Sequence, residues 1–335
     1  MKILERYFLP SPTPSVHAAT IEFWKGYPVF SWFGGTQEGF EDVAIYIYNL
    51  NNDKKTIVIG NKDAYPRWNP ILFNHDNNLY LFEKIGIFCD RWQTFIHNVT
   101  KWDNEITEKE VRANQYVLPT GLNGPVKLRP VVIKSDIFCG SSQETFYDWT
   151  SYIERYKIDN GKWKFQQRSN PLNIENKVLY RDQFNGSTKV SMGVIQPSLW
   201  IQNGKIKAFF RSSHGLNKIF YSENYDYDSY ENWATPEATN LLNPNSGVSA
   251  VYCKDNLYLA YNPSTQFRCP LIVEKLKQKS STLFENNDVD GILIENKPEM
   301  YAGFSYPYMI EHEGLLHLVY TYDRKRIEYV VIDPN

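Results

Sequence analysis

The chain has 335 residues, of which 42% are hydrophobic and 16% aromatic, so it carries ample material for a folded core. Its 36 basic and 38 acidic side chains nearly cancel, which excludes a global field that would recruit nucleic acid or an anionic membrane. No stretch approaches the roughly 18 uncharged residues of a membrane span, and the start "MKILERYFLPSPTPS" lacks the cleavage site of a secretory signal, so we expect a cytoplasmic protein.

The sulfur and imidazole side chains give no sign of a metal site. The cysteines are widely spaced and form no C-x-x-C pair, so we expect reduced and mostly buried thiols. The histidines nowhere show the spacing of metal ligands, and we expect neither a metal nor another cofactor. These residues are Cys89, Cys139, Cys253 and Cys269, and His17, His75, His97, His214, His312 and His317.

In chain order, the first expected element is a strand over residues 3–9, "ILERYFL", which has no hairpin of its own. One hairpin pattern then recurs six times: a polar or proline-containing start, an apolar strand, a short turn and a second apolar strand. The copies are "HAATIEFWKGYPVFSWFGG", "RWNPILFNHDNNLYLFEKIG", "LRPVVIKSDIFCGSS", "IQPSLWIQNGKIKAFFRSS", "SGVSAVYCKDNLYLAYNPS" and "SYPYMIEHEGLLHLVYTYD". Their turn residues, Gly26, Asn77, Ser135, Gly204, Asp255 and Gly314, lie 51, 58, 69, 51 and 59 residues apart.

A third short strand follows most copies, as in "VAIYIYNL", "SYIERYKID", "KIFYSEN", "CPLIVEKL" and "RIEYVVID". A hairpin cannot bury both faces alone, and radial stacking of small sheets leaves only short, protected edges. We therefore predict an all-β chain, a six-bladed β-propeller forming one domain over residues 1–335. A two-sheet sandwich is the competing fold, but it would not require the same hairpin six times.

The two ends of the chain are expected to meet. The sixth copy stops after "RIEYVVID", one strand short of a four-stranded blade, so we predict that the N-terminal strand closes the last blade. The segment "YSENYDYDSYENW", Tyr221 to Trp233, resembles a degraded Asp-box turn that has lost its glycine.

Starts of first strands and exits of second strands lie at the same sheet edge, so in a propeller they form one rim of the central channel. Basic side chains gather at this expected rim, and the planar fork of arginine pairs with carboxylate, phosphate or sulfate. An anionic ligand follows, although each charge alone could be a solvated loop residue. The expected binding residues are Arg67, Asn69, Lys127, Arg129, Gln196, Arg211, Asn245, Tyr261 and Arg268.

Candidate catalytic carboxylates occupy the strand exits. The loop in "SWFGGTQEGFEDVAIY" carries Glu38 and Asp42, and Glu144 in "CGSSQE" holds the equivalent exit of the third blade. Two carboxylates held across a sugar ring suit acid–base cleavage of a glycosidic bond. Asp42 could instead cap nearby backbone amides. Among the aromatic residues near the rim, Tyr306 is the best candidate for a sugar contact.

The chain resembles the neuraminidase-like proteins of the sialidase superfamily, which are built from BNR-type repeats. The resemblance covers nearly the whole chain and rests on "HAAT", "WFGGTQEGFEDVAIY", "PRWNPILF", "GLNGPVKLRP", "IQPSLW", "LLNPNSGVSAV", "YNPSTQFRCPL" and "FSYPYMI". It implies a six-bladed propeller and activity on glycosides of acidic sugars.

Residue by residue, the resemblance implies a modified site. Arg211 in "FFRSSHG" and Arg268 in "QFRCPL" look like the second and third carboxylate-binding arginines, while His17 stands where the first is expected. The loop from Glu38 to Asp42 takes the place of the acid/base aspartate. Phe304 or Tyr306 matches the nucleophilic tyrosine, and Val194 stands where its helper glutamate would be.

The leading hypothesis is a glycoside hydrolase that acts on an acidic carbohydrate, with Asp42, Glu38, Glu144, Tyr306 and His17 as the candidate catalytic residues. A polysaccharide lyase or a sugar transferase in surface-glycan assembly is the alternative reaction. A non-catalytic glycan-binding propeller is the alternative class. The sugar, the linkage and the oligomeric state do not follow from the sequence.

Overall fold

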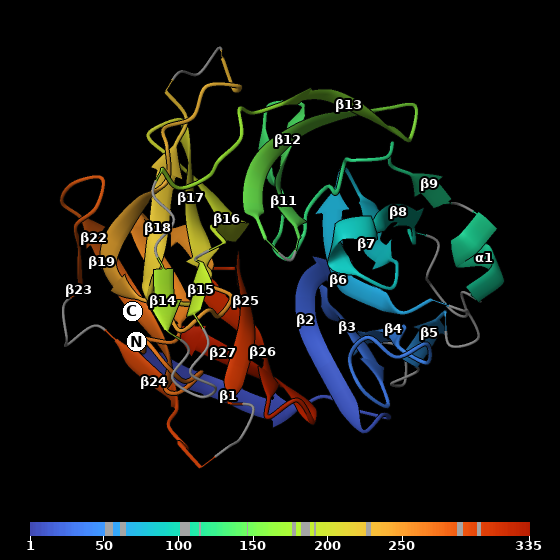
Figure 1. Ribbon diagram of the computed structural model, residues 1–335. Helices are drawn as coiled ribbons and strands as arrows, with labels where there is room; N and C mark the ends of the chain where they lie inside the picture. The colour runs from blue at the N-terminus through green and yellow to red at the C-terminus, as the bar shows by residue number, and fades with distance from the viewer. Residues whose placement is uncertain are drawn as a thin grey trace.

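The computed structural model describes residues 1–50, 56–60, 65–100, 108–113, 115–145, 147–175, 179–181, 188–190, 192–225, 229–286, 291–299 and 303–335. Six antiparallel sheets stand around a common centre, as Figure 1 shows. Each sheet is one blade, and its strands follow one another in sequence from the innermost outward, except in the last blade.

The strands of each blade, from the innermost outward, have the following bounds. Blade 1 contains β2 (Ser15–Trp24), β3 (Tyr27–Gly35), β4 (Ala44–Asn49) and β5 (Thr56–Ile59). Blade 2 contains β6 (Arg67–His75), β7 (Asn78–Ile85), β8 (Gln93–Asn98) and β9 (Gln115–Val117). Blade 3 contains β10 (Val131–Ile133), β11 (Asp136–Glu144), β12 (Trp149–Asp159) and β13 (Lys162–Arg168).

Blade 4 contains β16 (Val194–Gln202), β17 (Lys205–Ser212), β18 (Lys218–Glu223) and β19 (Glu237–Leu242). Blade 5 contains β20 (Ser249–Cys253), β21 (Asn256–Tyr261), β22 (Leu271–Gln278) and β23 (Phe284–Asn286), and β24 (Ile292–Glu295) also pairs with β22. Blade 6 contains β25 (Phe304–His312), β26 (Leu315–Tyr322), β27 (Arg326–Asp333) and β1 (Lys2–Phe8). Outside the blades lie the pair β14 (Leu179–Arg181) and β15 (Thr188–Val190), the 3-10 turn η1 (Cys89–Arg91) and the helix α1 (Glu108–Ala113).

Tight turns join the two inner strands of every blade. In blade 4, Gln202 pairs with Lys205 across the turn residues Asn203 and Gly204, which have φ of 50° and 72°. Positive φ at both turn positions matches the twist of the flanking strands, which is why asparagine and glycine favour this hairpin. The turn residues that the sequence marked therefore define the blades.

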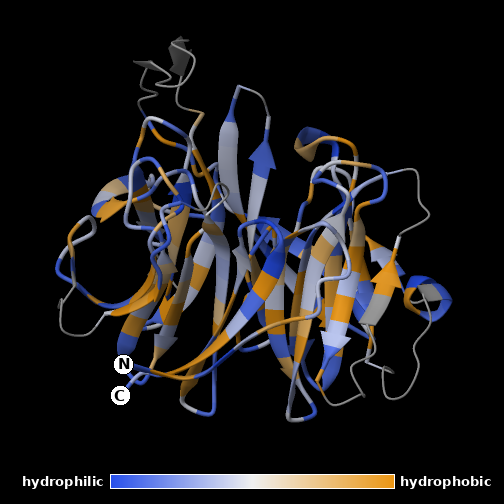
Figure 2. Ribbon diagram, turned by 90° about the horizontal axis from the view of Figure 1, so that it is seen from below, coloured by the Kyte–Doolittle hydropathy of each residue, from blue (hydrophilic) through white to orange (hydrophobic). Residues whose placement is uncertain are grey.

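The core lies between the blades. Six apolar clusters are formed by the described residues, one between each pair of neighbouring blades. Between blades 2 and 3, for example, Trp163 packs against Phe82 at 5.0 Å between ring centroids. Figure 2 shows the hydrophobic residues concentrated in the strands. Burial on both faces of a sheet requires near-continuous apolar strands, which the sequence supplies.

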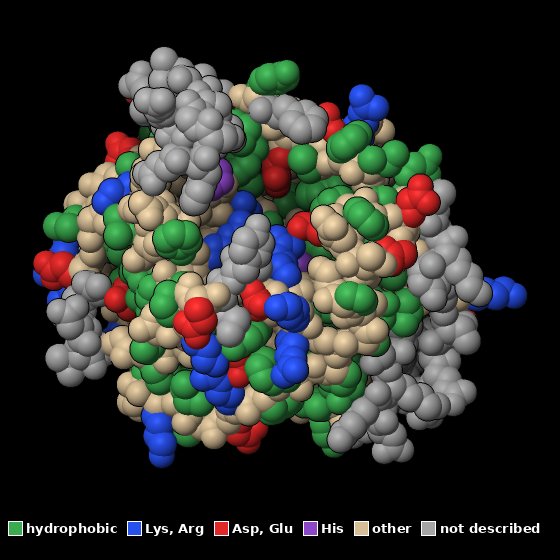
Figure 3. Space-filling model, turned by 60° about the horizontal axis from the view of Figure 1, so that its bottom comes forward, with side chains coloured by type: hydrophobic (Ala, Val, Ile, Leu, Met, Phe, Trp, Pro, Cys, Tyr) green, Lys and Arg blue, Asp and Glu red, His purple; other side chains and the backbone are tan. Residues whose placement is uncertain are grey.

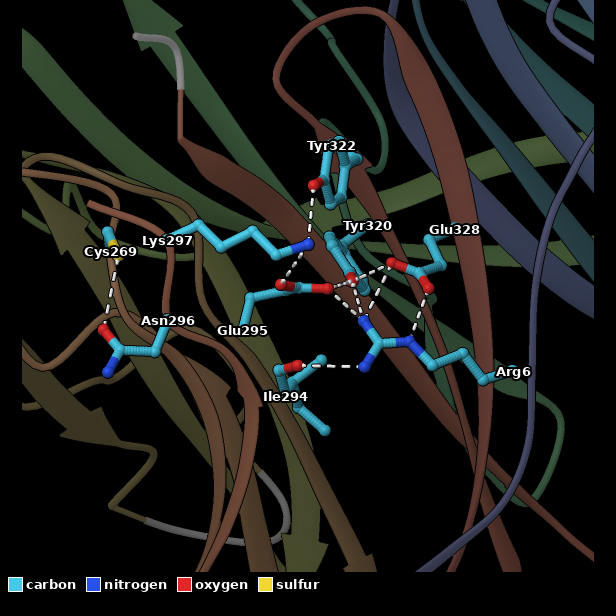
Figure 4. Close-up of polar contacts among 9 residues, drawn as sticks. All are labelled: Arg6, Cys269, Ile294, Glu295, Asn296, Lys297, Tyr320, Tyr322 and Glu328. Atoms are coloured by element: carbon cyan, nitrogen blue, oxygen red, sulfur yellow. Dashed lines mark hydrogen bonds and ion pairs between the residues drawn. The ribbon is translucent and has the colours of Figure 1, made fainter. Parts of the chain in front are cut away.

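The last blade is closed by the N-terminal strand, as predicted. Strand β1 pairs antiparallel with β27, from Lys2 opposite Asp333 to Phe8 opposite Glu328. The guanidinium of Arg6 then ties this strand to its neighbours by ion pairs with Glu295 and Glu328, as Figure 4 shows. Both carboxylates are buried, so the closing strand is held by charge as well as by backbone hydrogen bonds.

The cysteines are free thiols, with Cys139 and Cys253 buried and Cys89 and Cys269 partly exposed. Among the described helices, none has the length and apolar character needed to cross a membrane. Of the Asp-box-like segment, Asn224 forms a bridge with Trp233, whose side chain is buried in the cluster between blades 3 and 4. Its residues 226–228 lie outside the described part of the chain.

Candidate active site

The innermost strands are interrupted near their starts by β-bulges. The pairing register shifts between Trp68 and Ile71, between Ile195 and Ser198, and between Ser305 and Tyr308. Non-glycine residues with left-handed backbone lie in these bulges, namely Asn69 (φ 40°), Gln196 (φ 55°) and Tyr306 (φ 56°), and Ala18 (φ 54°) holds the same place in blade 1. A bulge re-aims a side chain, and such strained residues cluster at functional sites.

Arg211 joins three of the blades at these positions. Its Nε donates to Asn245 Oδ1 at 2.8 Å, and its Nη1 donates to Gln196 Oε1 at 3.2 Å and to the Tyr306 hydroxyl at 3.1 Å. Gln196 Nε2 also donates to the Tyr306 hydroxyl, at 2.9 Å. The guanidinium further lies 5.5 Å from the ring centroid of Trp149. All these hydrogen-bond partners are neutral, so they orient the guanidinium, and Arg211 forms no ion pair with a carboxylate among the described residues.

Two further cations lie in the same cluster. Lys127 is buried, donates to the carbonyl oxygen of Pro307 at 2.6 Å and lies 5.2 Å from the ring centroid of Tyr306. Burial and the charge of Arg211 hold the pKa of Lys127 well below its ordinary value. Arg268 donates to the backbone oxygen of Asn245 at 3.1 Å, and burial together with Arg211 lowers its pKa to about 10.

His17 lies beside this group as a neutral ring. Its Nδ1 is 2.9 Å from Thr321 Oγ1, its ring centroid is 4.1 Å from that of Tyr306, and its buried Nε2 has no hydrogen-bond partner among the described residues. Burial, followed by the charges of Arg324 and Arg268, holds the pKa of His17 well below its ordinary value. His17 is therefore uncharged at the position where the resemblance expects the first carboxylate-binding arginine.

Two of the predicted carboxylates face these cations. Glu144 Oε1 is buried and has no hydrogen-bond partner in the described part of the chain. Burial raises the pKa of Glu144 to about 7, against the opposing effect of Arg211 and with a smaller contribution from Glu38. Glu38 forms an ion pair with Arg324 and is partly exposed. The two acids thus differ, since one holds a proton near neutral pH and the other faces a cation.

Asp42 has the capping role that was the alternative. It is exposed, and its Oδ2 accepts hydrogen bonds from the backbone nitrogen and the hydroxyl of Thr36, at 2.8 Å and 2.7 Å. The carboxylate holds its own loop together, as expected for an acid that closes a turn. Glu38 of the same loop, and not Asp42, reaches the ion pair with Arg324.

Arg67 does not join the other arginines, contrary to the expectation from sequence. It is 2% exposed and forms an ion pair with Glu83, which also contacts His97 Nε2 at 2.6 Å. These partners come from β7 and β8 of its own blade. Its apolar neighbours in the sequence indicated that the charge of Arg67 would have a partner. That partner is Glu83 of the protein and not a ligand.

Arg129 and Tyr261 are also placed elsewhere. Arg129 Nε donates to Glu22 Oε2 at 2.8 Å and its guanidinium lies over the ring of Phe73, near the hairpin turns at the other end of the channel. Arg129 and Lys127 both precede β10 in the chain, and Lys127 instead donates to the carbonyl oxygen of Pro307 beside Tyr306. The Tyr261 hydroxyl donates to Glu274 at 2.6 Å, inside the apolar cluster between blades 4 and 5.

Asn69 lies in the bulge of β6, and Arg324 follows β26. Asn69 is 4% exposed and its side chain has no hydrogen-bond partner among the described residues. Arg324, in the basic segment "DRKR", forms an ion pair with Glu38 and was not among the site residues predicted from sequence. Figure 3 shows Lys and Arg side chains gathered at the middle of one face, beside a hollow. Trp149, whose ring centroid lies 5.5 Å from the Arg211 guanidinium, was considered among the aromatic residues near the rim, but only Tyr306 was predicted as a site residue.

Comparison with known proteins places these features in context. The family described as BNR repeat-like domain matches residues 29–318. No curated protein matches the chain. A solved Dyadobacter fermentans protein of unknown function is similar, with 10% identity, a TM-score of 0.71, and coverage of 99% of this chain and 98% of that one.

Two enzymes of known activity share the fold. The sialidase of Trypanosoma rangeli, solved with the inhibitor DANA, has 13% identity and a TM-score of 0.64 over 95% of this chain and 55% of that chain. The present chain thus spans about half the length of that sialidase. The α-L-arabinanase of Penicillium chrysogenum, complexed with arabinobiose, has 13% identity and a TM-score of 0.60 over 100% of this chain and 99% of that one. At these identities the likeness concerns the fold.

Proposed function

Since the chain belongs to the BNR repeat-like domain family, we propose that it is a glycoside hydrolase that cleaves glycosides of an acidic sugar. One observation carries the proposal: Arg211, Arg268 and Lys127 cluster around Tyr306 with no carboxylate partner among the described residues. Uncompensated buried cations are costly and are retained where a ligand supplies the opposite charge.

Five arginines elsewhere in the described part of the chain make the contrast. Arg6, Arg67, Arg129, Arg155 and Arg168 each face a carboxylate of the protein. In the described part of the chain, Arg211 instead has only neutral hydrogen-bond partners, which fix the plane of its guanidinium without neutralising its charge. A fork held in this way suits two-point binding of a sugar carboxylate.

The acids supply the chemistry of cleavage. Glu144, with a pKa of about 7, would protonate the departing glycosidic oxygen as the bond to the anomeric carbon breaks. The attacking group is either the Tyr306 oxygen or a water molecule activated by Glu38. Attack by Tyr306 and then water gives retention at the anomeric carbon, whereas direct attack by water gives inversion. Proton NMR of the released sugar distinguishes the two.

The binding step is tested by calorimetry on the purified protein. N-acetylneuraminic acid, glucuronic acid and neutral arabinobiose are titrated into the wild type and into Arg211→Met and Arg129→Met. We expect one of the two acids to bind the wild type and the Arg129→Met control. Binding of that acid should be lost in the Arg211→Met variant. Binding of arabinobiose alone would contradict the acidic specificity. Binding of an acid without any release of sugar from its glycosides would indicate a non-catalytic propeller.

A further inference from the structure

Lys127 is a buried amine beside the arginines of the candidate site. It is 3% exposed, and its Nζ donates to the carbonyl oxygen of Pro307 at 2.6 Å. Burial and the charge of Arg211 lower the pKa of Lys127, and no carboxylate of the described residues opposes them. This environment favours the neutral amine, which is a nucleophile, over the ammonium ion, which is not.

The amine and the arginines meet at one tyrosine ring. Lys127 Nζ lies 5.2 Å and the Arg211 guanidinium carbon 5.7 Å from the ring centroid of Tyr306. Arg211 and Arg268 are linked through Asn245, since they donate to its side-chain and backbone oxygens. An anion held by the two arginines therefore lies beside the amine. We propose that Lys127 forms an imine with the ketone carbon of a 2-keto acid whose carboxylate is bound by Arg211 and Arg268.

The class of the ligand follows from the two kinds of group that the cluster combines. Guanidinium groups hold a carboxylate, and an amine reacts with a carbonyl carbon. A 2-keto acid carries both on adjacent carbon atoms. A simple ketone lacks the anchor, and a 2-hydroxy acid lacks the electrophilic carbon. The ketone is supplied either by the open chain of an acidic ketose or by a small free acid such as pyruvate.

Imine formation is balanced within the site. The nitrogen lone pair attacks the ketone carbon, the π electrons of the C=O bond move to the oxygen, and both amine protons finally leave on that oxygen as water. No oxidant or reductant is needed. The Tyr306 oxygen accepts hydrogen bonds from Arg211 and Gln196, at 3.1 Å and 2.9 Å. Its own proton can therefore pass to the departing oxygen and be replaced from the nitrogen.

A glycine makes room for the amine. A Cβ atom at Gly247 would lie 2.6 Å from Cε and 3.1 Å from Cδ of Lys127. These distances are too short for van der Waals contact, so Gly247→Ala must move the flexible end of the lysine side chain. The variant therefore displaces the amine without replacing either arginine.

Lys84 is a matched control in the same chain. It is also buried and donates to the carbonyl oxygen of Pro125 at 2.7 Å. Burial lowers the pKa of Lys84 to about 7, and the charged neighbours that oppose this effect include the carboxylates of Glu154 and Glu83. Lys84 thus has a lowered pKa beside carboxylates, whereas Lys127 has one beside an arginine.

Reductive trapping tests the imine. The wild type is incubated with sodium cyanoborohydride and pyruvate, N-acetylneuraminic acid or acetone, and mass spectrometry of its peptides locates the reduced adduct. We expect pyruvate to label Lys127 at least about tenfold more than Lys84 or the exposed Lys164. Lactate should compete, and acetone should show no preference for Lys127. Additional labelling by N-acetylneuraminic acid would identify an acidic ketose as a source of the ketone, and labelling by pyruvate alone would identify a small free acid.

Arg211→Met and Gly247→Ala should each lower the labelling of Lys127 by about tenfold or more, and thermal unfolding checks that both variants fold. Equal labelling of Lys127 and Lys84 in the wild type, or no pyruvate adduct on Lys127, would overturn the imine. Lys127 shares the anion site of the proposed function but not its hydrolytic step. If an acidic sugar binds in calorimetry and Lys127 is not labelled, only the imine falls. If no acid binds and no adduct forms, both proposals fall.

Discussion

At the scale of single residues, Glu144 is the group whose environment departs most from that of an ordinary carboxylate. Burial, against the opposing charge of Arg211, raises its pKa to about 7. As the proton donor it must carry its proton, so activity should fall as the pH rises through about 7. Glu144→Gln should lower kcat by about 10²–10⁴-fold and leave a flat pH profile. A rate that still increases from pH 6 to pH 9 would remove Glu144 from this role.

The same pKa makes a prediction for stability. Because Glu144 binds its proton more tightly in the folded than in the unfolded protein, its contribution to stability is present below pH 4.5 and is lost as the pH rises to about 7. Glu144→Gln should therefore stabilise the protein at pH 8, on the order of 1–3 kcal/mol, and change little at pH 4. Urea unfolding at the two pH values measures this. Destabilisation at pH 8 would contradict the raised pKa.

Replacing Arg211 should weaken ligand binding strongly while changing the stability of the protein little. The guanidinium of Arg211 hydrogen-bonds to three neutral side chains and forms no ion pair with a carboxylate of the described residues. Arg211→Met should lower the affinity for the acidic sugar by about 10²-fold or more and change the free energy of unfolding by less than about 1.5 kcal/mol. Arg67→Met is the comparison, because it removes the cation that pairs with the buried Glu83. It should lower the free energy of unfolding by about 3–5 kcal/mol. Similar losses of stability in both would argue against an uncompensated cation at Arg211.

At the scale of elements, the bulges in the inner strands present side chains to the site at the expense of backbone strain. Asn69 has φ of 40° and a side chain that makes no hydrogen bond to the described residues. Glycine accepts this backbone freely, so Asn69→Gly should leave the free energy of unfolding within about 0.5 kcal/mol of the wild type. Affinity for the sugar should nevertheless fall. Thermal unfolding and calorimetry measure the two effects, and unchanged affinity would exclude Asn69 from the site.

At the scale of the whole molecule, closure of the ring depends on β1. Arg6 joins this strand to buried carboxylates of β24 and β27, Glu295 and Glu328. Arg6→Ala leaves both acids without their main cation, and we expect a loss of about 2–3 kcal/mol, reduced from the fully buried case because Arg6 is partly exposed. The exposed pair of Lys164 with Asp159 is the control, and Lys164→Ala should cost less than about 1 kcal/mol. Equal effects would mean that the closing network is not important.

The sequence alone determined the architecture. Turn residues such as Asn203 and Gly204, the apolar strands beside them and the unpaired strand at the N-terminus are local features, and each acts through backbone preferences that need no distant partner. For the same reason the sequence located the strand ends, and with them Gln196, Arg211, Asn245, Arg268 and Tyr306.

Only the tertiary structure decided which of the charges at those strand ends remain uncompensated. Arg67 and Arg268 look alike in the sequence, each between apolar neighbours, yet Arg67 meets Glu83 and Arg268 meets no carboxylate among the described residues. Likewise Asp42 binds its own loop, while Glu144 Oε1 has no hydrogen-bond partner among the described residues. Electrostatic balance depends on distances between side chains from different strands and blades, and packing in three dimensions sets those distances.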